Sequence, residues 1–118
     1  MAQLISKFVV SEAVLKDIPA IVKVHQQAFP GFLMTLLGPA FLYAYYQAVF
    51  DHPEKIFLVV RDAKHEIQGF VAGFAEPERF YRLLGKRKRR MMLSAVVYLT
   101  IRPHLWKRVF ENMKMVNQ

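Results

Sequence analysis

The sequence predicts an α/β fold of the α+β type, with elements in the order β-α-α-β-β and a helical, basic C-terminal segment after them. Two patterns carry this prediction: apolar residues at helical spacing in 17–29 and 39–50, and two apolar runs joined by a short polar turn in 55–75. Composition agrees, because 54% of the 118 residues are hydrophobic, above the usual ~45–50%. Disorder is excluded, and the length suits one domain.

The first strand is expected at residues 7–10, where the letters KFVV combine branched and aromatic side chains, with its exit at Ser11 and Glu12. The first helix begins after Asp17, a good N-cap residue, and ends at Pro30-Gly31. Its apolar residues share one helical face: Ile18, Ile21, Val22, His25, Ala28 and Phe29.

The second helix is expected from Pro39 to about Phe50, before Asp51-His52-Pro53. It is apolar nearly all round, so we expect it to be covered on two sides.

An antiparallel hairpin follows, formed by the runs KIFLVVRD and IQGFVAGFA around the turn AKHE. On its second strand, Gly69 and Gly73 share one face, whereas Phe70 and Phe74 share the other. Glycines inside a strand are explained by something that packs very close, either a helix or a ligand. We expect a helix on the glycine face.

Charge divides the chain into residues 1–75 and residues 76–118. The first part holds six basic and six acidic residues, and the second holds eleven and three, so the whole net charge of +8 lies in the second part. Helices are expected there at 77–84, 91–101 and 104–115. A basic segment attracts anionic lipid, nucleic acid or an acidic protein, and charge alone does not choose among them.

Residues 5–75 resemble the N-terminal half of the GNAT superfamily of N-acetyltransferases. The letters DIPAIVKVHQQAFP are similar to the first helix of the family, LGPAFLYAYYQAVFDHP to its second helix, and IFLVVRDAKHEIQGFVAGF to its second and third strands. In one bacterial branch a helix like RFYRLL follows, with further helices. The resemblance implies a partial GNAT-like fold in 1–75, with 76–118 as a helical segment of the same domain.

The resemblance further implies transfer of an acetyl group from acetyl-CoA to an amine. In that family the CoA pyrophosphate binds backbone N–H groups of a Q/R-x-x-G-x-G/A loop at a helix N-terminus. The nearest match is RLLGKR, Arg82–Arg87, in which Arg87 replaces a small residue and no strand precedes. No cofactor-binding residue is identified, so acetyl-CoA is expected by resemblance only. The implied enzyme is truncated or incomplete as a single chain, and inactive alone.

Candidate site residues follow from the same resemblance. The turn between the first two helices borders the acceptor site, which points to Phe32, Leu33, Met34 and Leu37. The alternative, that these side chains pack onto the sheet, is favoured because aromatic residues and methionine are usually in the core. Among possible bases, Glu76 lies just beyond the third strand, where it can also cap the next helix, and the catalytic residue remains unknown. His25 is interpreted as a core histidine.

The competing hypothesis is a non-catalytic interaction module that binds a partner protein or an anionic membrane surface. The cationic run Lys86, Arg87, Lys88, Arg89 and Arg90 is the candidate anion or membrane contact. Residues 91–101 span only ~16 Å as a helix, too short to cross a bilayer, but they suit its interface. Nucleic acid is disfavoured, because no aromatic residue is interleaved with the run. No metal is expected, since the four histidines lack paired ligand spacing and cysteine is absent.

The third strand of the predicted fold has an open edge. Exposed edges pair readily, so we expect a second copy or a complementary chain to cover it, or the C-terminal helices to fold over it. The start of the chain shows no secretory signal, because Lys7 and Glu12 interrupt MAQLISKFVVSEAV. The expected location is the cytoplasm, including the inner face of its membrane.

Overall fold

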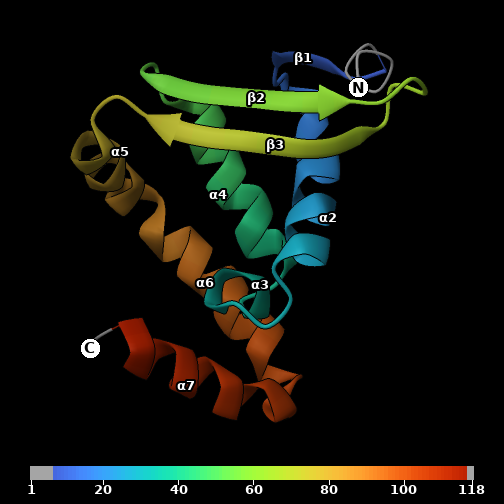
Figure 1. The fold of residues 1–118 in the computed structure, drawn as a ribbon. Coiled ribbons are helices and arrows are strands. Elements are labelled where there is room, and N and C mark those ends of the chain that lie inside the picture. The colour runs from blue at the N-terminus through green and yellow to red at the C-terminus, as the bar shows by residue number, and fades with distance from the viewer. Residues whose placement is uncertain (1–6, 117–118) are drawn as a thin grey trace.

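The computed structural model describes residues 7–116 and contains a three-stranded sheet with helices below it (Figure 1). The strands are β1 (Val9–Glu12), β2 (Lys55–Arg61) and β3 (Ile67–Phe74), in the order β1-β2-β3. Both neighbouring pairs are antiparallel, with Val10 opposite Val60 and Val59 opposite Phe70. The α+β class predicted from the sequence is confirmed.

The helical elements alternate with short turns along the chain. In order they are η1 (Leu15–Asp17), α2 (Ile18–Ala28), α3 (Leu33–Leu36), α4 (Pro39–Asp51), α5 (Pro77–Leu84), η2 (Gly85–Arg87), α6 (Lys88–Thr100), η3 (Pro103–Leu105) and α7 (Trp106–Val116). The two predicted helices before the hairpin are confirmed as α2 and α4. The short helix α3 lies in the connection between these two helices, where only a turn was expected. Strand β1 begins two residues later than predicted and includes Ser11 and Glu12.

The core lies between one face of the sheet and the helix pair α2 and α4. Phe57 and Val59 of β2 are buried there against side chains of both helices. The largest fully buried side chains are Ile18, Ile21, Leu42, Val49, Val59 and Phe80. Each contributes about 1.5–3 kcal/mol by leaving water, so this layer supplies most of the apolar stabilisation.

The helices cover the aromatic face of β3 and leave the glycine face open. The Phe70 ring meets Tyr46 of α4 edge to face at 5.3 Å. A side chain built at Gly69 or Gly73 would meet nothing within 4 Å, and Val71 between them is 57% exposed. The expectation of a helix on the glycine face is therefore wrong. Phenylalanine rings offer more apolar area than glycines, so burial favours the face that carries them.

Asp17 connects the start of α2 to the sheet. Its carboxylate accepts a hydrogen bond from the Arg61 guanidinium at 2.7 Å and another from the Val14 amide at 2.9 Å. Burial alone would raise the pKa of Asp17, but these hydrogen bonds and the charge of Arg61 outweigh it and lower the pKa. The side chain does not cap α2, although Asp17 occupies its N-cap position.

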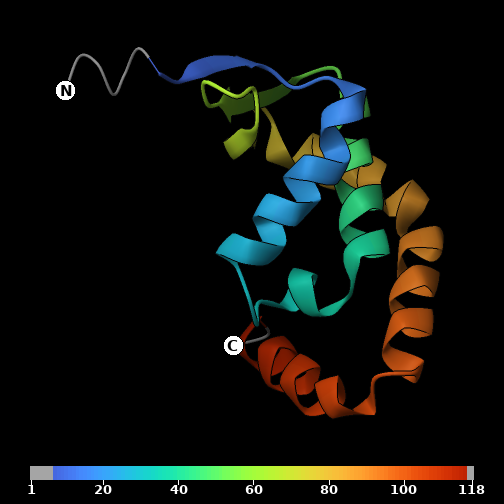
Figure 2. The same cartoon turned by 90° about the vertical axis from the view of Figure 1, so that its right-hand side faces the viewer.

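The second helix is covered on two sides, as its apolar surface predicts. Figure 2 shows α4 between α2 and α6, and α4 also contacts β2. The helices α5, α6 and α7 form an arm that leaves the sheet, and α7 returns to contact α3. Gly85 does not break this arm, because η2 joins α5 to α6 in a continuous helical path.

The outer edge of β3 is not covered by the arm. The strand order places β3 at one side of the sheet, and α6 and α7 lie away from it (Figure 1). Of the three occupants expected for this edge, the C-terminal helices are therefore wrong, because α6 packs against α4 and α7 packs against α3 instead. A second copy or a complementary chain stays a prediction.

Candidate functional site

Glu76, the candidate base, lies between β3 and α5 as the N-cap residue of α5. Backbone hydrogen bonds fix Glu76 in this turn, because the Glu76 carbonyl accepts them from the amides of Arg79 and Phe80 at 3.1 and 3.4 Å. Its side chain makes no capping hydrogen bond and is exposed. The interpretation of Glu76 as a side-chain cap is therefore wrong, and its carboxylate lies at the surface.

The four predicted acceptor contacts gather at α3, the turn of helix between α2 and α4. Phe32 is 57% exposed and its ring lies 5.4 Å from that of Phe29. Leu33, Met34 and Leu37 are half-buried. The favoured alternative is wrong in its location, since α3 lies at the far end of the helix pair from the sheet and contacts α4 and α7 (Figure 1), although Met34 does pack against the hydrophobic core. Gly31, with φ of +84°, lies in the turn between α2 and α3.

The structure does not bring Glu76 and the acceptor contacts together. Pro39, at one end of α4, follows α3, and Asp51, at the other end, adjoins the sheet. A helix of 13 residues spans ~20 Å. Glu76 lies at the sheet end, since the neighbouring Ala75 amide donates to the Glu54 carbonyl. A general base must reach its proton within about 3 Å or through one water, so these residues do not form one catalytic site.

His25 and Tyr46 form a buried pair between α2 and α4. The His25 Nδ1 atom and the Tyr46 hydroxyl oxygen are 2.6 Å apart and share a hydrogen bond. Burial lowers the pKa of His25 and, with the neighbouring Tyr45, raises the pKa of Tyr46. Both groups are therefore held neutral near pH 7. The imidazole Nε2 atom has no hydrogen-bond partner among the described residues, so His25 is a core histidine that is only partly satisfied.

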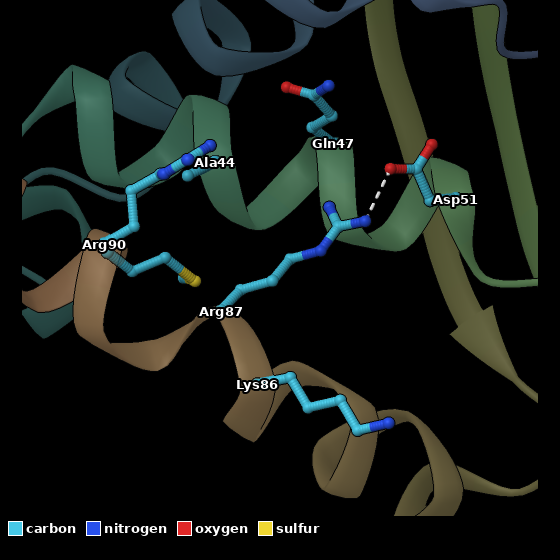
Figure 3. Close-up of a pocket in the computed structure, with 7 residues that line it drawn as sticks. Ala44, Gln47, Asp51, Lys86, Arg87 and Arg90 are labelled. Carbon is cyan, nitrogen blue, oxygen red and sulfur yellow. Dashed lines mark hydrogen bonds and ion pairs between the residues drawn. The ribbon is translucent and has the colours of Figure 1, made fainter.

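A polar hollow lies between α4 and the start of α6, with a volume of about 440 Å³. Lys86, Arg87 and Arg90 line it from the arm, and Gln47 and Asp51 line it from α4 (Figure 3). Arg87 reaches across and donates to the Asp51 carboxylate at 2.8 Å. Three cations face one carboxylate in this hollow. The hollow can therefore hold an anion.

A second, apolar hollow of about 520 Å³ continues along the same two helices. Leu93 and Val97 of α6, Ile101 directly after its end, and Ala40 of α4 line it, between Arg90 and Arg102. Arg90 lines both hollows, which therefore adjoin. Arg102 is fixed beside Tyr98, because its guanidinium lies 4.0 Å from the ring centroid and donates to the Tyr98 carbonyl at 3.2 Å. We call the two hollows together the α4–α6 groove.

Only part of the cationic run predicted from the sequence therefore lines the groove. Lys86, Arg87 and Arg90 line the groove, whereas Lys88 and Arg89 are exposed and do not line its polar hollow. Sequence reasoning missed the α4 wall, formed by Ala40, Ala44, Gln47 and Asp51. Their spacing of four, three and four residues is one helical stripe, and it was detectable as the small and polar gap in an otherwise apolar helix.

The segment Arg82–Arg87 is helical through α5 and η2. Gly85 has φ of −55°, and its amide hydrogen bonds back into α5. Its backbone N–H groups are therefore not arranged as the phosphate-binding loop that the resemblance implies.

Two further findings concern the part of the chain that the structure describes. No three His, Cys, Asp or Glu side chains gather there in a group that could hold a metal ion. None of the helices in residues 7–116 is both long and apolar enough to span a membrane.

Comparisons with protein-family models, with curated protein sequences and with solved structures find no match to this chain.

Proposed function

We propose that this chain carries the acceptor side of an acetyl-CoA-dependent N-acetyltransferase. The supporting observation is the order of its elements: a first strand, a pair of helices and an antiparallel hairpin that pairs with that strand. This is the order that the GNAT resemblance of residues 5–75 implies. A fold alone does not establish an activity, so the proposal also needs a substrate site.

The acceptor is assigned to the surface around α3. Phe32 presents an exposed ring, and Leu33, Met34 and Leu37 present half-buried apolar side chains beside it. These side chains suit the apolar part of an amine substrate. We assign no catalytic residue, because Glu76 lies about one helix length, ~20 Å, from α3.

The donor test must separate specific recognition from charge attraction. Acetyl-CoA carries several phosphate charges, and Lys86, Arg87 and Arg90 in the groove attract any polyanion. ATP is therefore the matched control, since it carries adenosine and phosphates without the acetylated pantetheine arm.

The experiment measures thermal unfolding of the chain at increasing acetyl-CoA or ATP, in 0.15 M salt. We expect acetyl-CoA to raise the melting temperature with the logarithm of its concentration, and to stabilise by about 2.7 kcal/mol at 100 times its Kd. ATP should give a smaller rise that vanishes in 0.5 M salt. Equal rises with both ligands, or none with either, would contradict the use of acetyl-CoA.

A second function, a non-catalytic interaction module, is favoured by the open face of the sheet. Val10, Ile56 and Val71 are 62%, 53% and 57% exposed on that face, next to the uncovered outer edge of β3. A strand of a second copy or of a complementary chain would cover the edge by pairing with β3, and the rest of that partner would bury these side chains by packing on the open face. This candidate takes precedence if the chain shows no specific response to acetyl-CoA.

A further inference from the structure

The outer face of α6 is apolar and is not covered within the described residues. Met91 and Ala95 are its buried residues, and Met91 faces α4 across the groove. About 100° or more around the helix from these two residues, four apolar side chains are more than half exposed, and three of the four also line the open apolar hollow of the groove. They are Leu93 at 64%, Val96 at 55%, Val97 at 58% and Ile101 at 73%, and we call them the apolar strip. A contiguous apolar surface of this kind marks a contact with a partner.

Arginines lie at both ends of the apolar strip. Arg89 and Arg90 precede Leu93 by one helical turn on the same side, and Arg102 follows Ile101. Within residues 7–116 neither Arg89 nor Arg90 takes part in an ion pair. The sequence of α6 contains no acidic residue. The surface is therefore apolar in its middle and cationic at its ends.

A partner has to supply both apolar contact and negative charge. A second copy docked strip to strip would bring like charges together, which disfavours self-association here. Nucleic acid would neutralise the arginines but would leave the apolar strip in water. The interface of an anionic bilayer supplies phosphates at the surface and hydrocarbon beneath it.

We propose that the apolar strip, with Arg89, Arg90 and Arg102, docks onto an anionic lipid bilayer. The 13 residues of α6 span ~20 Å, less than the ~30 Å hydrocarbon thickness, so α6 lies in the plane of the interface. This inference goes beyond acetyl transfer and does not depend on it.

The α4–α6 groove fits the same partner. Its polar hollow, with Lys86, Arg87 and Arg90, matches an anionic headgroup, and its apolar hollow matches part of an acyl chain. Arg90 lies where the two hollows meet, as the junction between headgroup and chain requires. The polar and apolar ends of the groove thus match the headgroup and the acyl chain of a single lipid.

The test is cosedimentation of the full chain with vesicles of phosphatidylcholine alone or with 30% phosphatidylglycerol. We expect binding to the anionic vesicles at least tenfold tighter than to the neutral ones, and weaker binding at 0.5 M than at 0.1 M salt. Each basic residue near such a surface strengthens binding about fivefold. The variant Arg89→Glu/Arg90→Glu should therefore lose at least ~25-fold.

The matched control is Lys23→Glu/Lys64→Glu, which changes two exposed lysines on α2 and in the β2–β3 turn. Both double variants lower the net charge by the same four units. The control should lose less than about fivefold, because its lysines lie away from the arm. Equal losses in the two variants would mean attraction by net charge alone, and would overturn the proposal.

A second variant, Leu93→Glu/Val97→Glu, tests the apolar strip. Both side chains are exposed, so the fold should be retained, which circular dichroism and the melting temperature verify. We expect it to lose binding to anionic vesicles at least tenfold. Unchanged vesicle binding by this variant would overturn the proposal. So would tighter binding to a single-stranded polynucleotide than to vesicles, or a dimer that this variant dissociates.

Discussion

At the scale of single residues, the buried pair of His25 and Tyr46 shows how the core constrains polar groups. A buried polar atom without a partner costs ~1–3 kcal/mol, and His25 Nε2 is such an atom among the described residues. The hydrogen bond to Tyr46 satisfies the other ring nitrogen at 2.6 Å. Protonation of the imidazole would add a buried charge, so the fold favours the neutral form.

The first prediction at this scale concerns pH. The pKa of His25 is lowered in the folded chain because burial disfavours the charged ring, whereas the unfolded chain keeps the ordinary value near 6.5. As the pH falls below ~6.5, the unfolded chain binds a proton that the folded chain resists, so stability declines. We expect His25→Gln to reduce this decline between pH 7.5 and 5.5 by up to about 1 kcal/mol.

Urea unfolding at the two pH values measures this effect, with His104→Gln in η3 as the exposed control. The control should keep the pH dependence of the natural chain. If His25→Gln keeps it as well, burial of His25 is not its cause.

Asp17 shows what the sequence can and cannot predict for a single side chain. Its position before an apolar helical stripe correctly predicts the start of α2. The sequence does not reveal that the carboxylate turns to Arg61, 44 residues later, because that contact exists only once the end of β2 has come next to the start of α2. Hydrogen bonds between residues far apart in the sequence can be assigned only when the fold is known.

At the scale of helices and strands, periodicity predicts which elements form better than it predicts which face is covered. The bounds of β2 and β3 that the hairpin pattern predicts agree with the structure to within one residue. The glycine face of β3 is open all the same, because the rings of Phe70 and Phe74 attract the helices to their own side. A single strand shows two distinct faces, and the side that is buried depends on all neighbouring strands and helices.

The close approach of α4 and α6 depends on Gly38. This residue has φ of +104°, and a side chain built on it would meet the Tyr98 ring at 2.6 Å. Gly31 also has positive φ, but nothing lies within 4 Å of a side chain there. A substitution at Gly31 therefore tests backbone strain alone, whereas one at Gly38 tests strain together with contact with α6.

We predict that Gly38→Ala destabilises the chain more than Gly31→Ala. Backbone strain costs ~1–3 kcal/mol in each, and the clash with Tyr98 adds about another 1–3 kcal/mol only in the first. Chemical denaturation of each variant, with and without Tyr98→Ala, measures the difference. Tyr98→Ala should offset part of the cost of Gly38→Ala and should add independently, within ~0.5 kcal/mol, to Gly31→Ala. Additive effects in both pairs would contradict the close approach.

At the scale of the whole molecule, the candidate surfaces lie on different parts of the fold. The surface around α3, assigned to the acceptor, is formed by the helix pair and the arm, whereas the apolar strip belongs to the arm alone (Figure 2). The sequence predicted the charge of the arm, because the excess of basic residues after position 75 is visible in it. It could not predict the α4–α6 groove, which requires the arm to fold back along α4.

The distribution of buried side chains predicts two levels of stability. The helices α2 and α4 bury four residues each, but α6 buries only Met91 and Ala95. Opening the arm therefore exposes less apolar area than opening the sheet and helix layer. We predict that native-state hydrogen exchange gives lower opening free energies for the amides of α6 and α7 than for those of α2, α4 and β2.

The variant Met91→Ala makes this last prediction sharper. Met91 is 4% exposed between α4 and α6, and a large-to-small change there costs ~2–5 kcal/mol. If the arm opens separately, that loss falls on the amides of α6 and α7, while those of α2 and β2 keep their opening free energies because the interface they use is intact. Leu42→Ala in the core is the matched control and should lower protection in every element, since the arm cannot stay docked on an unfolded α4. An equal loss of protection in α2, β2 and α6 of the Met91→Ala variant would mean that the arm and the layer unfold as one cooperative unit.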